Sequence, residues 1–298
     1  MSNSVRLWAN ATVSGPSPHD QTFDSLIAAR YIHWPQRETA MLRLLMLAAL
    51  LTTYLSCANA AEPEIIDDAA LLLRLEREGG KLVTQGKAPA FDQLTKGLGR
   101  TPAPISLPPE PASARSIEEI YRLRRAGVLI LARIFHCGKC NRQHVSSATA
   151  LVLSPDGICL TNHHVFEASQ GQIVMGMVAM TARGEVLPVV EVMGSNRNDD
   201  IAVFRVEPAG AILTALPLGP SPETGSRITV IGHPAEHFFS LSTGQVARHA
   251  RNGHGAQVAE RMFITADYAK GSSGSPVFDD AGRVVGIAAV TQPVYYDQ

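Results

Sequence analysis

Three short segments of this chain carry the residue types that together can turn a hydroxyl group into a nucleophile. They read TNHHV (161–165), NDDIAV (198–203) and GSSGSP (271–276). A serine hydroxyl is a weak nucleophile at neutral pH and needs an adjacent base, which an imidazole supplies because it titrates near neutrality. A carboxylate can orient that imidazole and stabilise its charged form. The segments therefore predict covalent catalysis by serine, histidine and aspartate.

Each segment offers more than one candidate residue. The competing groups are His163 and His164, Asp199 and Asp200, and Ser273 with either Ser272 or Ser275. A lone serine in a Gly-Ser turn is usually only a turn residue, and a lone aspartate before a strand is usually a cap or solvated. Residue type alone leaves these choices open.

The three segments resemble the signature segments of trypsin-like serine peptidases, the clan that includes the HtrA (Deg) proteases and the staphylococcal glutamyl endopeptidases. The family patterns T-x-x-H-V, D-I-A and G-x-S-G-x-P all match, in the order His, Asp, Ser. The resemblance covers roughly Val128 to Val290, and no C-terminal PDZ domain fits after it. It implies a serine endopeptidase that acts on polypeptides and uses no cofactor or metal.

The resemblance also selects residues within each segment. The family histidine directly precedes the valine, the family aspartate directly precedes Ile-Ala, and the G-x-S-G frame marks the serine. The implied catalytic residues are His164, Asp200 and Ser273. The backbone N–H groups of Gly271 and Ser273 would form the oxyanion hole, which stabilises the tetrahedral intermediate.

The residues around Ser273 allow a prediction of substrate specificity. Asp267 lies six residues before it, the offset of the aspartate at the floor of the trypsin pocket, which would favour Lys or Arg. HtrA-type proteins also carry an acidic residue in this region without that specificity. We favour their pattern, with an apolar pocket near Tyr268 that accepts small aliphatic residues. The segment Ala289-Val290-Thr291 would pair with the substrate backbone.

The cysteines suggest a second feature. Cys137 and Cys140 form a C-x-x-C pair with His136 and His144 nearby, which resembles a zinc knuckle. A four-ligand zinc site would need His144 and Cys159 as partners. Exported proteins usually oxidise close cysteine pairs, so we predict a Cys137–Cys140 disulfide, with zinc or free thiols as the alternatives. Cys159, on an apolar strand, is expected to be a buried core thiol.

The elements that must position these residues are short β-strands. From Val128 the chain is a series of runs rich in Val, Ile and Phe, separated by turns, which indicates an all-β barrel or sandwich. The resemblance narrows this to two six-stranded antiparallel β-barrels of the chymotrypsin-like type. The runs are 128–135, 147–154, 157–165, 171–180, 185–193, 200–206, 227–233, 261–268, 275–280 and 283–290. Within them, the histidine segment directly follows the strand ICL (158–160), and the serine segment is followed by the strand VF (277–278).

Helical signals precede the β region. Asp67 can cap a helix over 67–78 that Gly79-Gly80 would end, and a capping box at Ser116 opens a short helix over 116–126. A proline-rich linker at 101–111 separates them. We therefore expect a helical and linker segment at 61–127 and the protease domain at 128–298.

Residues 41–60 have the form of a signal peptide. Arg43 precedes an apolar run over 44–55, and Ala58-Asn59-Ala60 is a small-x-small cleavage pattern. The mature chain would begin at Ala61, in the periplasm or outside the cell, without a stable membrane anchor. Because signal peptides are N-terminal, we expect Met41 to be the initiator and residues 1–40 to be a spurious extension.

Composition excludes some partners and permits a packed core. The 298 residues have a net charge of −1 and no basic stripe, which argues against nucleic acid as a partner.

A rival function is a catalytically silent trypsin-like fold that serves as a protein-binding module. Such proteins generally lack one member of the triad, whereas this chain keeps all three. An α/β-hydrolase needs G-x-S-x-G and a different residue order, so it is excluded.

Overall fold

The structure is a computed structural model. It describes residues 64–102, 104–105, 107, 113–137, 139–140, 142–167, 171–252 and 259–289. Ile65–Gln298 and Met1–Glu64 are separate compact units, and the expected signal peptide and the extension before it lie outside the described residues. Among the described helices, none is long and apolar enough to cross a membrane.

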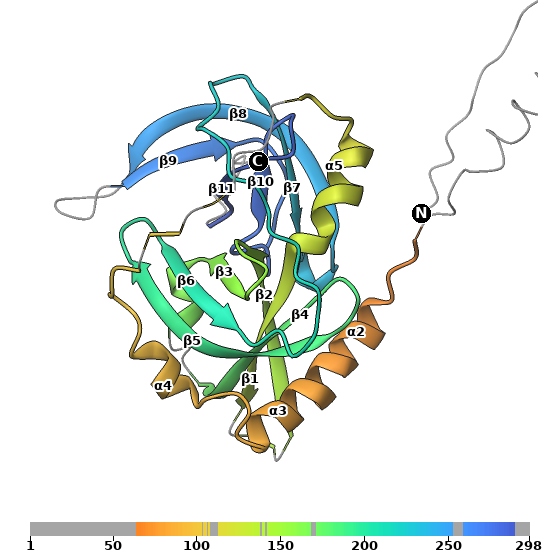
Figure 1. The fold of residues 1–298 in the computed structure, drawn as a ribbon, viewed down its shortest axis with the longest axis vertical. Coiled ribbons are helices and arrows are strands. Elements are labelled where there is room, and N and C mark those ends of the chain that lie inside the picture. Colours follow the sequence, from red (N-terminus) through yellow and green to blue (C-terminus); the bar gives the residue numbers. More distant parts are fainter. Residues whose placement is uncertain are drawn as a thin grey trace, which may run out of the picture. The chain divides into compact units, whose positions relative to one another are not determined.

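Six antiparallel strands close into a barrel in the order β1-β2-β3-β6-β5-β4 (Figure 1). These strands are β1 (Val128–His136), β2 (Gln143–Val152), β3 (Ile158–Thr161), β4 (Ile173–Met180), β5 (Val186–Asn196) and β6 (Ile201–Val206). Side chains alternate along a strand, so Leu129 and Leu131 of β1 fill the barrel interior while Ile130 and Ile134 face outward into a second core. Strand β1 is thus buried on both faces, which explains its continuous apolar sequence.

The second sheet has the order β11-β10-β7-β8-β9. Its strands are β7 (Arg227–Gly232), β8 (Ser240–Asn252), β9 (Ala259–Ile264), β10 (Pro276–Phe278) and β11 (Val284–Ile287). The prediction of a two-barrel, all-β fold is confirmed, and the first barrel has the six strands expected. In the second, the described residues form five strands in an open sheet, to whose β11 edge Leu218 adds an isolated parallel bridge with Val284.

A helix from the N-terminal segment runs along the first barrel (Figure 1). It comprises α2 (Asp68–Arg74), a π-helical turn (Leu75–Gly79) and α3 (Gly80–Thr84), and Asp67 caps it as predicted. The prediction that Gly79-Gly80 ends this helix was wrong. Both glycines are buried, and a Cβ at Gly79 would lie 2.9 Å from a methyl group of Val178. These glycines therefore allow close packing on the barrel.

The remaining helices are short. They are α4 (Phe91–Thr95), α5 (Ile117–Arg124) and single 3₁₀ turns at Arg125–Gly127, His163–Phe166 and Pro234–Glu236. The capping box that opens α5 is confirmed, since Ser116 and Glu119 each accept the other's backbone N–H. Helix α5 packs Ile120 into a core with residues of both sheets, so the N-terminal segment contacts both.

Candidate active site

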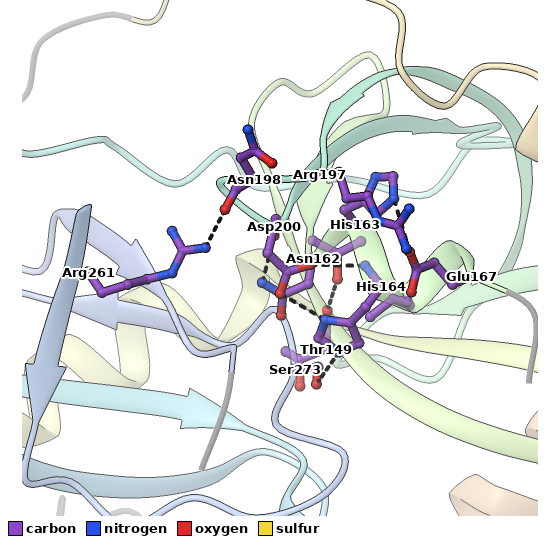
Figure 2. Close-up of polar contacts among 12 residues, drawn as sticks. Thr149, Asn162, His163, His164, Glu167, Arg197, Asn198, Asp200, Arg261 and Ser273 are labelled. Carbon is purple, nitrogen blue, oxygen red and sulfur yellow. Dashed lines mark hydrogen bonds and ion pairs between the residues drawn. The ribbon is translucent and has the colours of Figure 1, made fainter. Parts of the chain in front are cut away.

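His164, Asp200 and Ser273 lie in one chain of hydrogen bonds (Figure 2). Nδ1 of His164 is 2.8 Å from Oδ2 of Asp200, and Nε2 is 2.9 Å from the Ser273 hydroxyl. The backbone N–H of His164 also donates to Oδ1 of Asp200 at 3.0 Å. The carboxylate is therefore bound by the backbone and the side chain of the same histidine, which fixes the ring with one nitrogen toward the serine.

The competing histidine and aspartate point elsewhere. His163 is buried, with Nδ1 3.0 Å from the Ser195 hydroxyl. Its Nε2 lies 3.4 Å from Glu167 (Figure 2). The Asp199 carboxylate accepts a hydrogen bond from the Asn196 side chain. Neither residue is placed to contact the serine.

The competing serines are also engaged in other bonds. Ser272 is buried, and its hydroxyl accepts from the backbone N–H of Ala269 at 3.3 Å. Ser275 is buried and donates to the Thr149 hydroxyl at 3.1 Å. Ser273 is the half-buried member of the three, and it is the one that meets His164.

Local backbone geometry positions the histidine and the aspartate. His164 lies in the 3₁₀ turn after β3, where the Arg133 side chain donates to the carbonyls of His164 and Val165. Asp200 directly precedes β6 with a φ of 56°, a left-handed conformation that aspartate tolerates better than most residues. Asn162 donates to the Asp200 carbonyl at 2.9 Å. Arg133 and Asn162 were not singled out from the sequence.

Electrostatics keep the aspartate charged. Burial raises the pKa of Asp200, but the hydrogen bonds from His164 outweigh burial and hold that pKa below its usual range. The positive charge of Arg261 on β9 acts in the same direction. The His164 side chain is 40% exposed and that of Asp200 is 16% exposed, so the imidazole can be reached from solvent while the carboxylate is shielded.

The turn that carries Ser273 depends on two glycines with positive φ. Gly271 has a φ of 99° and Gly274 a φ of 86°, and a Cβ on Gly274 would collide with the Thr149 carbonyl. The N–H of Ser272 donates to Ala269 at 3.0 Å. Among the described residues, the N–H groups of Gly271 and Ser273 have no acceptor. They remain available to a ligand.

Thr149, on β2 of the first barrel, holds this turn in place. Its backbone N–H donates to the Ser273 carbonyl at 2.8 Å, and its hydroxyl donates to the Gly271 carbonyl at 3.0 Å. Sequence reasoning missed this residue, because a buried threonine within a strand resembles any other β-branched core residue. The turn of the second sheet that carries Ser273 is thus hydrogen-bonded to the first barrel.

The residues expected to set specificity are only partly described. Asp267 is exposed, and its carbonyl accepts from the Ser242 hydroxyl at 2.7 Å. Tyr268 is half-buried, and burial raises the pKa of its hydroxyl. Ala289 lies just beyond β11, while Val290 and Thr291 are outside the described residues.

The cysteines differ from the expected pairing. The sulfurs of Cys137 and Cys140 are 3.5 Å apart and unbonded, so the predicted disulfide is absent from this structure. Nε2 of His144 lies 3.1 Å from Cys140 Sγ. Hydrogen bonds from the backbone of Lys139 and from Cys140 lower the pKa of the Cys137 thiol to about 7. Cys159 is fully buried, as expected, and burial raises the pKa of its thiol.

Comparison with known proteins gives a consistent result. Residues 148–287 match the family described as trypsin-like peptidase domain. The "Probable periplasmic serine endoprotease DegP-like" of Hahella chejuensis is 33% identical over 146 residues, which are 48% of this chain and 29% of that protein. "Serine endoprotease DegS" of Haemophilus influenzae is 27% identical over 147 residues, 48% of this chain and 41% of that protein. The chain therefore spans less than half the length of these two relatives.

A solved structure shows the same fold. The "HtrA-type protease AlgW with decapeptide" superposes with a TM-score of 0.52 at 20% identity, covering 60% of this chain and 60% of that chain.

Proposed function

We propose that the chain is a serine endopeptidase of the HtrA type with Ser273 as its nucleophile, on the premise that residues 148–287 match the trypsin-like peptidase domain family. The observation that carries the proposal is the unbroken Asp200–His164–Ser273 hydrogen-bond chain, which ends at a solvent-accessible imidazole and hydroxyl. No metal or cofactor is required by this arrangement.

The first half of the reaction forms an acyl-enzyme. Ser273 Oγ attacks the scissile carbonyl carbon while its proton moves to Nε2 of His164, and Asp200 stabilises the imidazolium. The carbonyl oxygen becomes an oxyanion that the N–H groups of Gly271 and Ser273 can bind, a contribution worth about 10²–10³ in rate per donor. The C–N bond then breaks, and His164 returns the proton to the leaving amine.

The second half regenerates the enzyme. Water attacks the Ser273 ester and gives its proton to His164, and collapse of the second tetrahedral intermediate releases the new carboxyl group. The proton returns to Ser273 Oγ. The histidine therefore acts as base and acid in turn, which requires that it stay fixed by Asp200 throughout.

Polypeptides are the proposed substrates. In support, Ala288 already pairs with Gly274 and Ser275 through backbone hydrogen bonds beside the nucleophile. The next residues, Ala289, Val290 and Thr291, would offer their backbone to an extended peptide. The exposure of Asp267 favours the aliphatic pocket over a buried anionic floor for Lys or Arg.

Export is also part of the proposal. The motif at 41–60 supports it, and so do the names of the DegP-like relatives, which are described as periplasmic. The domain would then work in the periplasm or outside the cell, after cleavage at Ala60.

A fluorophosphonate probe tests the catalytic assignment directly, because it labels only an activated serine. We expect one label per chain, mapped to Ser273 by peptide mass spectrometry and lost in His164→Ala. The His163→Ala variant is the matched control and should still be labelled. A folded wild-type protein that is not labelled would instead support a silent, peptide-binding fold.

A further inference from the structure

Three side chains of types that commonly bind metal ions meet at the tip of the β1–β2 hairpin. The proposed reaction does not use this part of the barrel. Cys137 directly follows β1, Cys140 lies in the connecting loop and His144 is the second residue of β2. Their Sγ, Sγ and Nε2 atoms all lie within 4.8 Å of one another. They are exposed or half-exposed, so an ion can reach them from solvent.

The spacing of these atoms fits a small ion with thiolate and imidazole ligands. Tetrahedral zinc, with bonds of about 2.3 Å to sulfur and about 2.0–2.1 Å to nitrogen, separates two sulfurs by about 3.8 Å and a sulfur from a nitrogen by about 3.5 Å. The observed separations are 3.5 Å between the sulfurs and 3.1 Å between Cys140 and His144. A slight outward movement of the side chains would admit the ion.

The neighbouring strand also supports a metal site. The Phe135 ring of β1 packs against the His144 ring of β2, with 5.5 Å between the ring centroids, and this contact restricts the orientation of the imidazole.

The fourth ligand considered from the sequence, Cys159, is not available. Cys159 is fully buried, and its sulfur lies 3.5 Å from the Gly157 carbonyl, in the core of the barrel. The described residues thus supply three ligands, and the fourth position of a tetrahedral ion would be left to water or another small ligand.

We propose that Cys137, Cys140 and His144 bind one zinc ion at this hairpin tip. Two thiolates and one imidazole are a ligand set typical of Zn²⁺. Binding displaces the two thiol protons and keeps both sulfurs reduced, in place of a disulfide. The ion would also hold β1 to β2 at the end where the loop connects them, which stabilises the strand whose Arg133 holds the His164 turn.

Zinc binding can be measured on the full chain, independently of any peptidase activity. The protein is purified with a reductant, which is then removed under anaerobic conditions. Zn²⁺ or Co²⁺ is added as the probe, and unbound ion is removed by dialysis. We expect one ion per chain by elemental analysis, thiolate-to-cobalt charge-transfer bands in the Co²⁺ form, and a higher Tm with Zn²⁺.

Matched variants identify the ligands. Cys140→Ser and His144→Gln should bind zinc more than about 100-fold more weakly, because loss even of an outer partner costs 10–100-fold. His136→Gln, in the same hairpin, should bind as the wild type does, since Nδ1 of His136 already faces the Arg142 carbonyl. Circular dichroism checks that each variant is folded.

Three results would overturn the proposal. The wild type could take up no ion while both thiols still react with an alkylating reagent. It could instead close a Cys137–Cys140 disulfide in air despite equimolar Zn²⁺. Finally, His144→Gln could bind zinc as tightly as His136→Gln does.

Discussion

At the scale of single residues, the three serines of one turn differ in their hydrogen-bond partners. Ser272 and Ser275 are buried and bonded to Ala269 and Thr149, whereas Ser273 faces the imidazole of His164. The two buried hydroxyls support the turn, and the third is the proposed nucleophile.

Replacement of each serine should therefore have a different effect. We expect Ser273→Ala to lower kcat by about 10⁶-fold with the fold intact, as loss of a triad serine does elsewhere. Ser272→Ala and Ser275→Ala should each cost about 1 kcal/mol of stability and less than about tenfold in rate. Peptide hydrolysis and urea unfolding measure both quantities. A Ser273→Ala rate within tenfold of wild type would refute the assignment.

Asp200 should make the free energy of unfolding depend on pH. Its folded pKa lies below the usual value near 4, so its charge stabilises the fold above about pH 4, and this stabilisation is lost as the pH falls through the lower folded pKa. Asp200→Asn should lower kcat by about 10⁴-fold. Urea unfolding should show a stability gap between wild type and Asp200→Asn at pH 6 that narrows below about pH 4. Asp199→Asn is the control, and an equal rate loss there would contradict the choice of Asp200.

Specificity depends on whether Asp267 reaches the substrate. Because it is exposed, a substrate Lys or Arg would gain little from pairing with it in water. We expect wild type to cleave after Val faster than after Arg or Phe, and Asp267→Ala to change all three rates about equally. Peptides that differ only at the cleaved position give these rates. A strong preference for Arg that vanishes in Asp267→Ala would reverse this conclusion.

At the scale of elements, the N-terminal helix reaches the nucleophile turn through one loop. Asp68 of α2 accepts from the N–H of Phe238 at 2.9 Å and lies 3.3 Å from His237. In the same loop, the N–H of Ala235 donates to the Lys270 carbonyl at 2.6 Å. Lys270 directly precedes Gly271, so α2 supports the proposed oxyanion hole from a distance.

This connection predicts a positioning role for Asp68. We expect Asp68→Ala to lower kcat about tenfold with little change in KM, because the loop no longer fixes the turn that carries Gly271. Asp67→Ala is the matched control, since it removes the α2 cap at about 1 kcal/mol but does not touch the loop. Steady-state kinetics and thermal unfolding separate the two. Equal rates in both variants at equal stability would leave Asp68 a merely structural residue.

Strong local signals made some elements predictable and left others hidden. The apolar runs of the first barrel and the capping box at Ser116 were read correctly, because burial and capping leave marks within a few residues. Strand β8 (Ser240–Asn252) was missed, because most of its side chains are exposed and Val246 is its one buried residue among those described. The helix beyond Gly79 was missed because its packing partners are distant in sequence.

Some residues of the candidate site could also be predicted from the sequence, and others could not. The motifs identified His164, Asp200 and Ser273, since each lies in a short segment with a recognisable frame. Thr149 and Arg133 were not identified, because their roles exist only once β1 and β2 lie beside the catalytic turns. Long-range contacts of this kind leave no local pattern.

At the scale of the whole molecule, the first barrel and the second sheet both contribute residues to the candidate site. The first barrel supplies His164 and Asp200, and the second sheet supplies Ser273. Thr149 bonds the nucleophile turn, Arg261 of β9 donates to the Asn198 carbonyl at 2.6 Å, and a common core joins the two. Because the triad exists only while both bodies are folded and docked, loss of activity on heating should follow the global unfolding transition.

The last prediction concerns export. The compact unit that contains the site begins at Ile65, shortly after the expected cleavage at Ala60, so cleavage there would leave every described contact of α2 intact. We expect the protein made in its own host to begin at Ala61, as N-terminal sequencing would show, and to be lost from the cell exterior or periplasm when Leu47 and Leu50 are replaced by Arg. Cleavage within α2 would release Asp68 and expose the core around Leu75, and it should therefore yield an unstable, less active chain. A mature chain that begins before Met41 would contradict both the signal peptide and the proposed initiator.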